Sequence, residues 1–416
     1  MPSSRRAVVT GLGLASPIGV GVDAFRAALA SRASGVHPFK LIDASAMPIR
    51  FGGEIEEFDP LPFLDKKERK QLKYMIRTIR LGVVACRLAL REAGLGPGGI
   101  DPERLGLSMG TGILPGEMGD LAPAGEACDA GDRIDLERWP SEGMPLIPPM
   151  WMLNHVPNMP ASHAAILEDA RGPNNTVIQG SAAALLALGE AFRIVQHGRA
   201  DAMLAGGTDT RTATINAIRW HKYAPHSRRE SDPARACQPF GRTRDGQVLG
   251  EGAGIALLEE REHALRRGAR IIGEVAGFGS AFDLRDDGSG LARAIAAALR
   301  EAGIGPDDLD HANAAGSGSL DEDPIEARGL RAAVGPLPVL AMKSWMGNPG
   351  CGASVLELAA SLLRDEAPGT LNHEGTADDC PVEVMREPRL IARPWVLKTA
   401  MTEQGQCAAV VVRREG

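Results

Sequence analysis

The chain has 416 residues, a formal net charge of −7, and 44% hydrophobic and 24% charged residues. This length exceeds one ordinary core and predicts two domains or two fused halves. The composition is typical of a globular protein, and the acidic balance argues against nucleic acid as the main partner. Six scattered cysteines without zinc-site spacing predict no disulfide framework and no metal site, and favour a reducing, cytoplasmic location.

Strand and helix patterns alternate along the chain. Residues 5–22 superficially resemble an export signal, but Gly11, Gly13, Ser16 and Pro17 interrupt the apolar run and favour a buried strand and turn. No apolar run is long enough to span a membrane. Strands are expected at 7–13, 105–112, 175–180, 201–207, 253–260, 270–280, 309–316, 338–342, 395–399 and 406–413, and helices at 23–32, 78–94, 182–198, before Gly268, and at 291–303, 323–334 and 352–364.

This alternation predicts a parallel α/β architecture. A strand–turn–helix theme returns near residue 270 and indicates two similar halves, although the sequence holds no strict repeat. Residues 113–155 are irregular and predict a long excursion over the surface or over a pocket.

Two glycine-rich stretches resemble nucleotide-binding loops only in part. The stretch 11-GLGLAS-16 has serine in place of the third glycine of a dinucleotide loop. The stretch 244-RDGQVLGEGAG-254 lacks the GK[ST] of a phosphate loop and instead predicts a close crossing of backbone segments. No cofactor is expected from either.

The stretch 177-VIQGSAAALLALGEAF-192 reads as a strand that enters a helix, with Ser181 at the turn. Together with this turn, several motifs resemble the β-ketoacyl synthase family in order and spacing. They are RRAVVTGLGLASPIG at 5–19, GTG at 110–112, VPNMPA at 156–161, GPNNT at 172–176, LAGGTDT at 204–210, the 244–254 stretch, NAAGSGSLDEDPIEA at 313–327 and MKSWMGNPGCGA at 342–353. The resemblance implies a thiolase-like fold of two related halves, 1–255 and 256–416, in α-β-α-β-α layers, and normally a dimer.

That family transfers an acyl group to a cysteine at a strand-to-helix turn, and two histidines assist decarboxylation and hold the developing oxyanion. The motifs place these three roles at Ser181, Ala315 and Asn348. A serine hydroxyl is far less acidic than a thiol, Ala315 has no polar side chain, and Asn348 cannot shuttle protons near neutral pH. The resemblance therefore implies a degenerate triad.

Other family positions are retained or altered. Lys343 and Glu326 stand where the family has them, either as a buried structural network or, for Lys343, as a base for Ser181. Gln404 takes the place of a phenylalanine that gates the acyl pocket, and its N–H and that of Ser181 are the expected oxyanion hole.

The segment 65–80 is basic within an acidic chain. Its simplest interpretation is a solvated helix face, but the resemblance also implies docking of an acidic acyl carrier protein. The residues expected to dock the carrier are Lys66, Lys67, Arg69, Lys70 and Lys73, and Arg77 and Arg80 extend the same run.

These features favour a catalytically silent homologue similar to the chain-length-factor (KSβ) subunits of type II polyketide synthases, paired with an active ketosynthase subunit. Those subunits often carry glutamine at the nucleophile position, whereas this chain has Ser181 there and Gln179 two residues earlier. One alternative is a working acyltransferase or condensing enzyme that uses Ser181, with Lys343 or Asn348. Another is a homodimeric acyl-binding protein. Neither nucleic acid nor a membrane is an expected partner.

Overall fold

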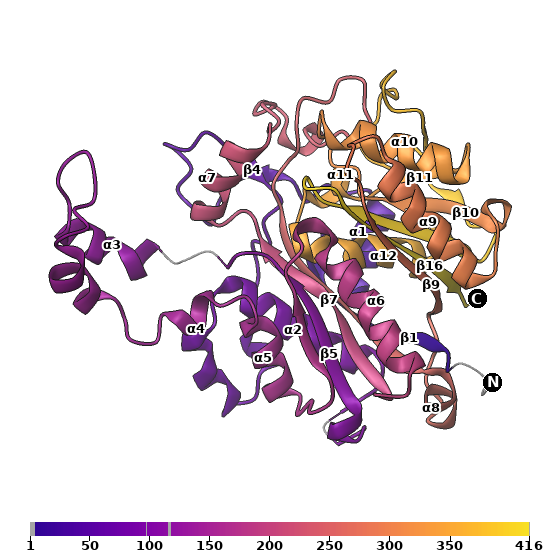
Figure 1. The fold of residues 1–416 in the computed structure, drawn as a ribbon, viewed down its shortest axis with the longest axis horizontal. Coiled ribbons are helices and arrows are strands. Elements are labelled where there is room, and N and C mark those ends of the chain that lie inside the picture. The colour runs from indigo at the N-terminus through magenta and orange to yellow at the C-terminus, as the bar shows by residue number, and fades with distance from the viewer. Residues whose placement is uncertain (1–4, 97, 115–117, 416) are drawn as a thin grey trace.

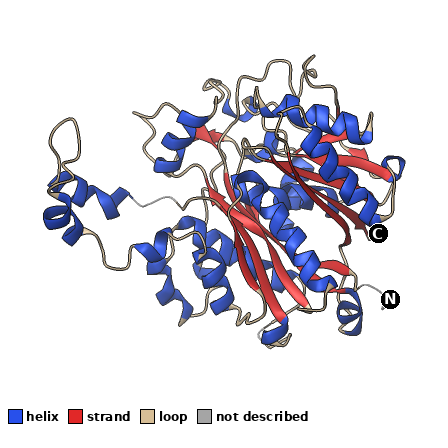
Figure 2. Ribbon diagram, in the orientation of Figure 1, coloured by secondary structure: helices blue, strands red, loops and turns tan. Residues whose placement is uncertain are grey.

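A computed structural model describes residues 5–96, 98–114 and 118–415. Its main sheet contains two runs of five strands with the same order and the same directions. Figures 1 and 2 show the strands of the sheet with helices packed around them. The first run is β1 (Ala7–Ser16), β8 (Glu251–Glu260), β7 (Ala202–Thr210), β5 (Leu105–Thr111) and β6 (Asn174–Val177). The second run is β9 (Gly273–Phe282), β16 (Gln406–Arg414), β15 (Trp395–Met401), β10 (Leu309–Ala314) and β11 (Pro338–Ala341), followed by β13 (Glu383–Val384).

In each run the first three strands are antiparallel and the last three are parallel. Antiparallel pairing of Ala7–Val9 with Gly273–Val275 joins the runs through β1 and β9. The two-half organisation expected from the sequence is therefore present. The boundary expected at 255/256 falls inside β8, and α8 (Arg261–Arg266) follows that strand before the second run begins.

Helices form a middle layer and two outer layers. The helices α6 (Ala183–Gln196) and α12 (Ala353–Leu362) each contact strands of both halves. On the outer faces, α2 (Arg77–Glu92) and α5 (Met159–Leu167) cover the first run, whereas α9 (Ser289–Ala302) and α10 (Glu322–Val334) cover the second. These are the α-β-α-β-α layers of the thiolase-like fold.

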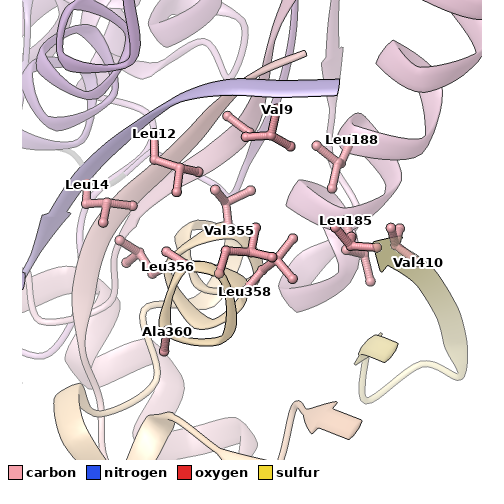
Figure 3. Close-up of a cluster of buried hydrophobic side chains, with 14 of the residues drawn as sticks. Val9, Leu12, Leu14, Leu185, Leu188, Val355, Leu356, Leu358, Ala360 and Val410 are labelled. Atoms are coloured by element: carbon pink, nitrogen blue, oxygen red, sulfur yellow. The ribbon is translucent and has the colours of Figure 1, made fainter. Parts of the chain in front are cut away.

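The main core lies where the middle helices meet the sheet (Figure 3). Leu185 and Leu188 of α6 and Leu356 and Leu358 of α12 pack there with apolar side chains of β1 and β16. Every residue of α12 is buried, because protein covers all sides of this helix. The apolar character of its sequence follows from that position.

Most of the expected elements are present with small shifts at their ends. Residues 7–16 form a fully buried strand, as the interpretation against an export signal required. The basic run contains a 3₁₀ turn over Glu68–Tyr74 instead of an α-helix. The remaining elements are α1 (Val22–Ser31), α3 (Met118–Ala127), α4 (Met152–His155), α7 (Thr214–Tyr223), α11 (Lys343–Met346), β2 (Gly19–Val20), β3 (His37–Pro38), β4 (Phe51–Gly52), β12 (Glu366–Ala367) and β14 (Arg389–Leu390).

The 113–155 excursion projects from the first half, and α3 lies far from the sheet (Figure 1). Its described part holds α3, a π-helical turn over Trp139–Gly143 and α4. Several of its large apolar side chains are exposed, including Leu136, Met144, Leu146, Met150 and Met152. Among the described residues, no helix is both long and apolar enough to cross a bilayer.

Candidate functional site

Ser181 lies on a sharp turn between β6 and α6, as its sequence pattern predicts. Gly180 has a φ of 49°, which glycine adopts without the steric cost of a Cβ. The 3₁₀ turn Gly180–Ala182 then leads directly into α6. The side chain of Ser181 is buried at the amino end of this helix, where backbone N–H groups favour negative charge.

The second half contains a matching turn. Gly350, with a φ of 53°, begins the 3₁₀ turn Gly350–Gly352, which leads into α12. Cys351 therefore occupies the position in the second half that Ser181 occupies in the first. The two turns meet, and the Cys351 thiol donates a hydrogen bond of 3.0 Å to the Gly180 carbonyl oxygen.

Arg211 is the polar side chain that contacts Ser181. Its Nη2 donates a hydrogen bond of 2.9 Å to Ser181 Oγ, and its side chain is wholly buried. The guanidinium lies 3.8 Å from the ring centroid of Trp220, while its Nε lies 3.7 Å from Asp209 Oδ2. Burial raises the pKa of Asp209 despite this neighbouring charge.

Asp209 also contacts the second turn. The Cys351 N–H donates a hydrogen bond of 3.2 Å to Asp209 Oδ2. Burial, together with the Asp209 charge, raises the pKa of the Cys351 thiol well above its ordinary value. Cys351 is therefore a protonated thiol near neutral pH and a poor nucleophile.

The two positions assigned to histidines make hydrogen bonds within the protein, and Asn348 directly precedes the second turn. The Ala315 N–H donates a hydrogen bond of 2.8 Å to Glu326 Oε1, which also accepts one of 2.8 Å from the Thr399 hydroxyl. Asn348 Nδ2 donates to Gln247 Oε1 at 2.8 Å, and its Oδ1 accepts from the Gly350 N–H. Burial raises the pKa of Glu326.

Lys343 belongs to a buried ionic cluster with two other charged side chains. Its Nζ donates to the Ala315 carbonyl oxygen and to Glu357 Oε1, the latter at 2.8 Å. Lys398 Nζ lies 2.7 Å from Glu357 Oε2. Burial acts to raise the pKa of Glu357, but the two ammonium groups outweigh it and lower that pKa. Lys343 and Glu326 thus belong to buried networks. This agrees with the structural interpretation of these residues, the other being Lys343 as a base for Ser181.

The turn between β15 and β16 lies beside the Ser181 turn, because a Cβ added to Gly180 would lie 3.3 Å from Thr402 Cγ2. This turn carries Gln404, whose N–H as part of an oxyanion hole stays a prediction.

Burial and the nearby Glu403 charge raise the pKa of the partly buried Glu322 to about 8. Glu322 is therefore mostly protonated near neutral pH.

Sequence reasoning missed five residues that build this site: Asp209, Arg211, Gln247, Cys351 and Glu357. Two of them, Glu357 and Arg211, carried a usable signal. Glu357 is an acidic residue inside the apolar helix 352–364, and a buried carboxylate needs a cation beside it. Arg211 directly follows the LAGGTDT motif and is likewise a charge beside a buried strand. Arg211 and Ser181 are 30 residues apart in the sequence, so the local pattern of apolar and polar residues does not predict their contact.

The group that binds the Ser181 hydroxyl is a guanidinium, which donates a hydrogen bond and does not accept a proton. Among the described residues, no imidazole or carboxylate hydrogen-bonds the Ser181 hydroxyl. A serine nucleophile ordinarily needs such a base to take its proton. The described residues also contain no group of three or more His, Cys, Asp or Glu side chains placed to hold a metal ion.

The fold and the glycine turn at Ser181 define a thiolase-like protein, and family comparison specifies its class. The family profile "Beta-ketoacyl synthase, N-terminal domain" matches residues 4–264, and "Beta-ketoacyl synthase, C-terminal domain" matches residues 272–373. The chain belongs to the β-ketoacyl synthase family.

Curated relatives and solved structures resemble it over nearly its whole length. It is 35% identical to "3-oxoacyl-[acyl-carrier-protein] synthase 2" of Synechocystis, covering 91% of this chain and 90% of that protein. It is 33% identical to the "Tetracenomycin polyketide synthase ketoacyl synthase alpha subunit" of Streptomyces glaucescens, covering 93% of each. The structure titled "The ishigamide ketosynthase/chain length factor" superposes with a TM-score of 0.86 at 27% identity over 100% of both chains.

Proposed function

We propose that this chain is a non-condensing, chain-length-factor-like subunit, which pairs with an active ketosynthase that extends a chain on an acyl carrier protein. The observation that carries this proposal is the hydrogen bond from the buried Arg211 guanidinium to Ser181 Oγ. The guanidinium is held beside the hydroxyl by its stacking on Trp220. It donates to one of the two lone pairs of the hydroxyl oxygen and so makes that oxygen a weaker nucleophile.

The positions around Ser181 support the same conclusion. Ala315 offers no proton donor from its side chain, and the Asn348 amide is engaged with Gln247 and Gly350. A decarboxylative condensation needs groups that stabilise a developing oxyanion in the transition state. These side chains, as they are arranged here, contribute little to that stabilisation.

An exposed edge and an exposed apolar segment support a partner subunit. The strand β6 ends the sheet with Asn174 and Asn175 exposed, and Ile178 just beyond it is 54% exposed. Apolar side chains of the 113–155 excursion are exposed as well. Open strand edges and large exposed apolar side chains are typical of surfaces that a second chain covers.

The basic run is positioned to meet an acidic carrier protein. Five cationic side chains of this run are exposed: Lys66, Lys67, Arg69, Lys70 and Lys73. Arg77, by contrast, turns inward and donates hydrogen bonds of 2.6 and 2.7 Å to the buried Glu251. A cluster of one sign on an acidic chain steers an acidic partner to that face.

The alternative function is acyl transfer through Ser181. It is favoured by the retained hydroxyl in a nucleophile-type turn and by the 35% identity to a 3-oxoacyl synthase. It also needs a base, and Lys343, considered for that role, has its ammonium bound to Glu357 and to the Ala315 carbonyl.

Intact-mass spectrometry after incubation with acyl-carrier-protein thioesters separates the two functions. The proposal expects no acyl adduct on the wild-type chain, whereas an adduct that Ser181→Ala abolishes would overturn it. Co-expression with an active ketosynthase, followed by size-exclusion chromatography, tests the pairing. A stable homodimer that ignores every ketosynthase tested would count against it.

A further inference from the structure

A cavity of about 390 Å³ lies at the carboxyl end of α2, where α2 and α5 lie side by side (Figure 1). Its apolar lining comes from α2, α5, the start of β5 and the connection between α2 and β5, and consists of Leu90, Leu95, Ile100, Leu105 and Leu167. Of the described residues that line it, none belongs to the Ser181 site. A mainly apolar cavity with a few charged groups is the usual form of a small-molecule site.

The charged side of the cavity holds two carboxylates against one guanidinium. Arg87 Nε donates a hydrogen bond of 2.5 Å to Glu168 Oε1, and its Nη2 donates one of 3.1 Å to Glu68 Oε1. All three side chains line the cavity. With all three groups ionised, two negative charges face one positive charge.

Glu168 has an acceptor that the protein leaves free. Its side chain is only 8% exposed, and among the described residues its Oε2 accepts no hydrogen bond. Burial raises the pKa of Glu168, and the Arg87 charge opposes this rise without cancelling it. The free oxygen and the incompletely compensated charge both favour a ligand that donates an N–H group and carries a positive charge.

The other charged groups at the cavity leave this balance in place. Asp65, Arg91 and Asp169 also line it. Asp169 pairs with Arg171 at 2.7 Å, so Arg91 is left to offset Asp65. Salt screens the exposed lysines of the neighbouring basic run at physiological ionic strength. The remaining charge matches a monocation and opposes a carboxylate or a phosphate.

We propose that this cavity binds a small amphiphilic amine, with its ammonium group on Glu168 Oε2 and its apolar part against Leu90, Leu95 and Ile100. The ammonium supplies both the missing donor and the missing charge, and the apolar part covers the leucine and isoleucine side chains. Binding is reversible and forms no covalent bond. The site goes beyond the proposed subunit function and does not depend on it.

Fluorine NMR of a small probe provides the readout. The full-length protein is titrated against para-fluorophenethylamine at neutral pH and physiological ionic strength, and broadening of the fluorine resonance is measured. The alcohol and carboxylic acid of the same skeleton are the neutral and anionic counterparts. We expect saturable broadening with the amine, displaced by unlabelled hexylamine, and binding about tenfold or more weaker for the other two compounds.

Variants assign the signal to this cavity. Glu168→Gln keeps the shape of the side chain and should weaken amine binding about tenfold or more, because a charge-assisted hydrogen bond is lost. The matched control is Asp169→Asn, an exposed neighbouring carboxylate that also lines the cavity, and it should change the affinity less than about threefold. Ile100→Trp keeps both buried carboxylates, fills the cavity and should abolish binding.

Circular dichroism checks that each variant is folded, and Ile100→Trp decides the question if Glu168→Gln unfolds. The proposal is overturned by the absence of a saturable signal with the amine, by equal or tighter binding of the alcohol or the acid, or by unchanged amine affinity in a folded Glu168→Gln or Ile100→Trp variant. Acyl adducts on Ser181 would contradict the silent-subunit function without removing this site.

Discussion

The Arg211 guanidinium donates a hydrogen bond of 2.9 Å to the Ser181 hydroxyl within the protein interior. A fixed positive charge therefore lies beside the position that the family reserves for a nucleophile. Such a charge stabilises an anion there more than it helps a neutral hydroxyl to react. The charge can be measured by placing a titratable group at residue 181.

Ser181→Cys provides that group. Arg211 and the α6 amino terminus should lower the pKa of the introduced thiol, so alkylation by iodoacetamide should begin at lower pH than in Ser181→Cys/Arg211→Met. The expected difference is about one to three pH units, because an opposite charge at this range shifts a pKa by that much. Identical pH profiles would show that Arg211 does not act on residue 181.

Glu357→Ala tests the buried ionic cluster. It leaves the Lys343 and Lys398 ammonium groups without their shared carboxylate. The free energy of unfolding should fall by about 3–5 kcal/mol, as is typical when one partner of a buried ion pair is removed. Urea denaturation measures it. The control is Glu387→Ala, whose side chain is 80% exposed beside Arg32 and should change stability by less than about 1 kcal/mol.

The pH dependence of stability follows from the same carboxylate. The pKa of Glu357 is lower in the folded chain than its ordinary value of 4.5, so its contribution is present above that value and lost as pH falls through the folded pKa. The stability difference between wild type and Glu357→Gln should therefore shrink on acidification below pH 4.5. A difference that grows instead would contradict the sign of this shift.

The two turn glycines should differ in their tolerance of a methyl group. Gly180→Ala forces alanine into the left-handed region and should cost about 1–2 kcal/mol. Gly350→Ala carries the same strain, and its Cβ would lie 2.2 Å from Asp209 Oδ2, so about 2–5 kcal/mol is expected. Thermal denaturation ranks them, and the reverse order would contradict the packing described here.

Reversal of charge in the basic run tests carrier docking. Lys66→Glu/Lys70→Glu should slow association with an acyl carrier protein about tenfold or more at low salt, and added salt should reduce the difference. Stopped-flow fluorescence measures the rate. Lys222→Glu, an exposed control on another element, should have little effect. An equal loss in both variants would mean that only net charge matters.

The local pattern of apolar and small residues predicted the buried strands and helices and the glycine turn. The strand at 7–16, the helix at 353–362 and the turn at Ser181 follow from apolar runs and small residues. The basic run was expected to be helical, but Leu72 and Tyr74 are only partly buried and a 3₁₀ turn forms over Glu68–Tyr74. Its apolar contacts are too few to stabilise a longer helix.

The contacts that decide the chemistry were less predictable. Motif spacing assigns the three family positions to Ser181, Ala315 and Asn348, but which side chains bind them depends on how distant strands meet. Arg211 reaches Ser181 from the end of β7, and Cys351 reaches Gly180 from the other half. The two halves share the same strand order. The sequence holds no strict repeat that would reveal this equivalence.

The meeting of the two turns has a mechanical consequence. The Cys351 thiol is hydrogen-bonded to the Gly180 carbonyl oxygen. On its other side Cys351 packs closely against Gly207, where an added Cβ would lie 2.1 Å from the Cys351 carbonyl oxygen. The amino ends of α6 and α12 must therefore shift together. A displacement of one turn, whether by a bound ligand or a docked subunit, therefore reaches the other half through this junction as well as through the β1–β9 pairing.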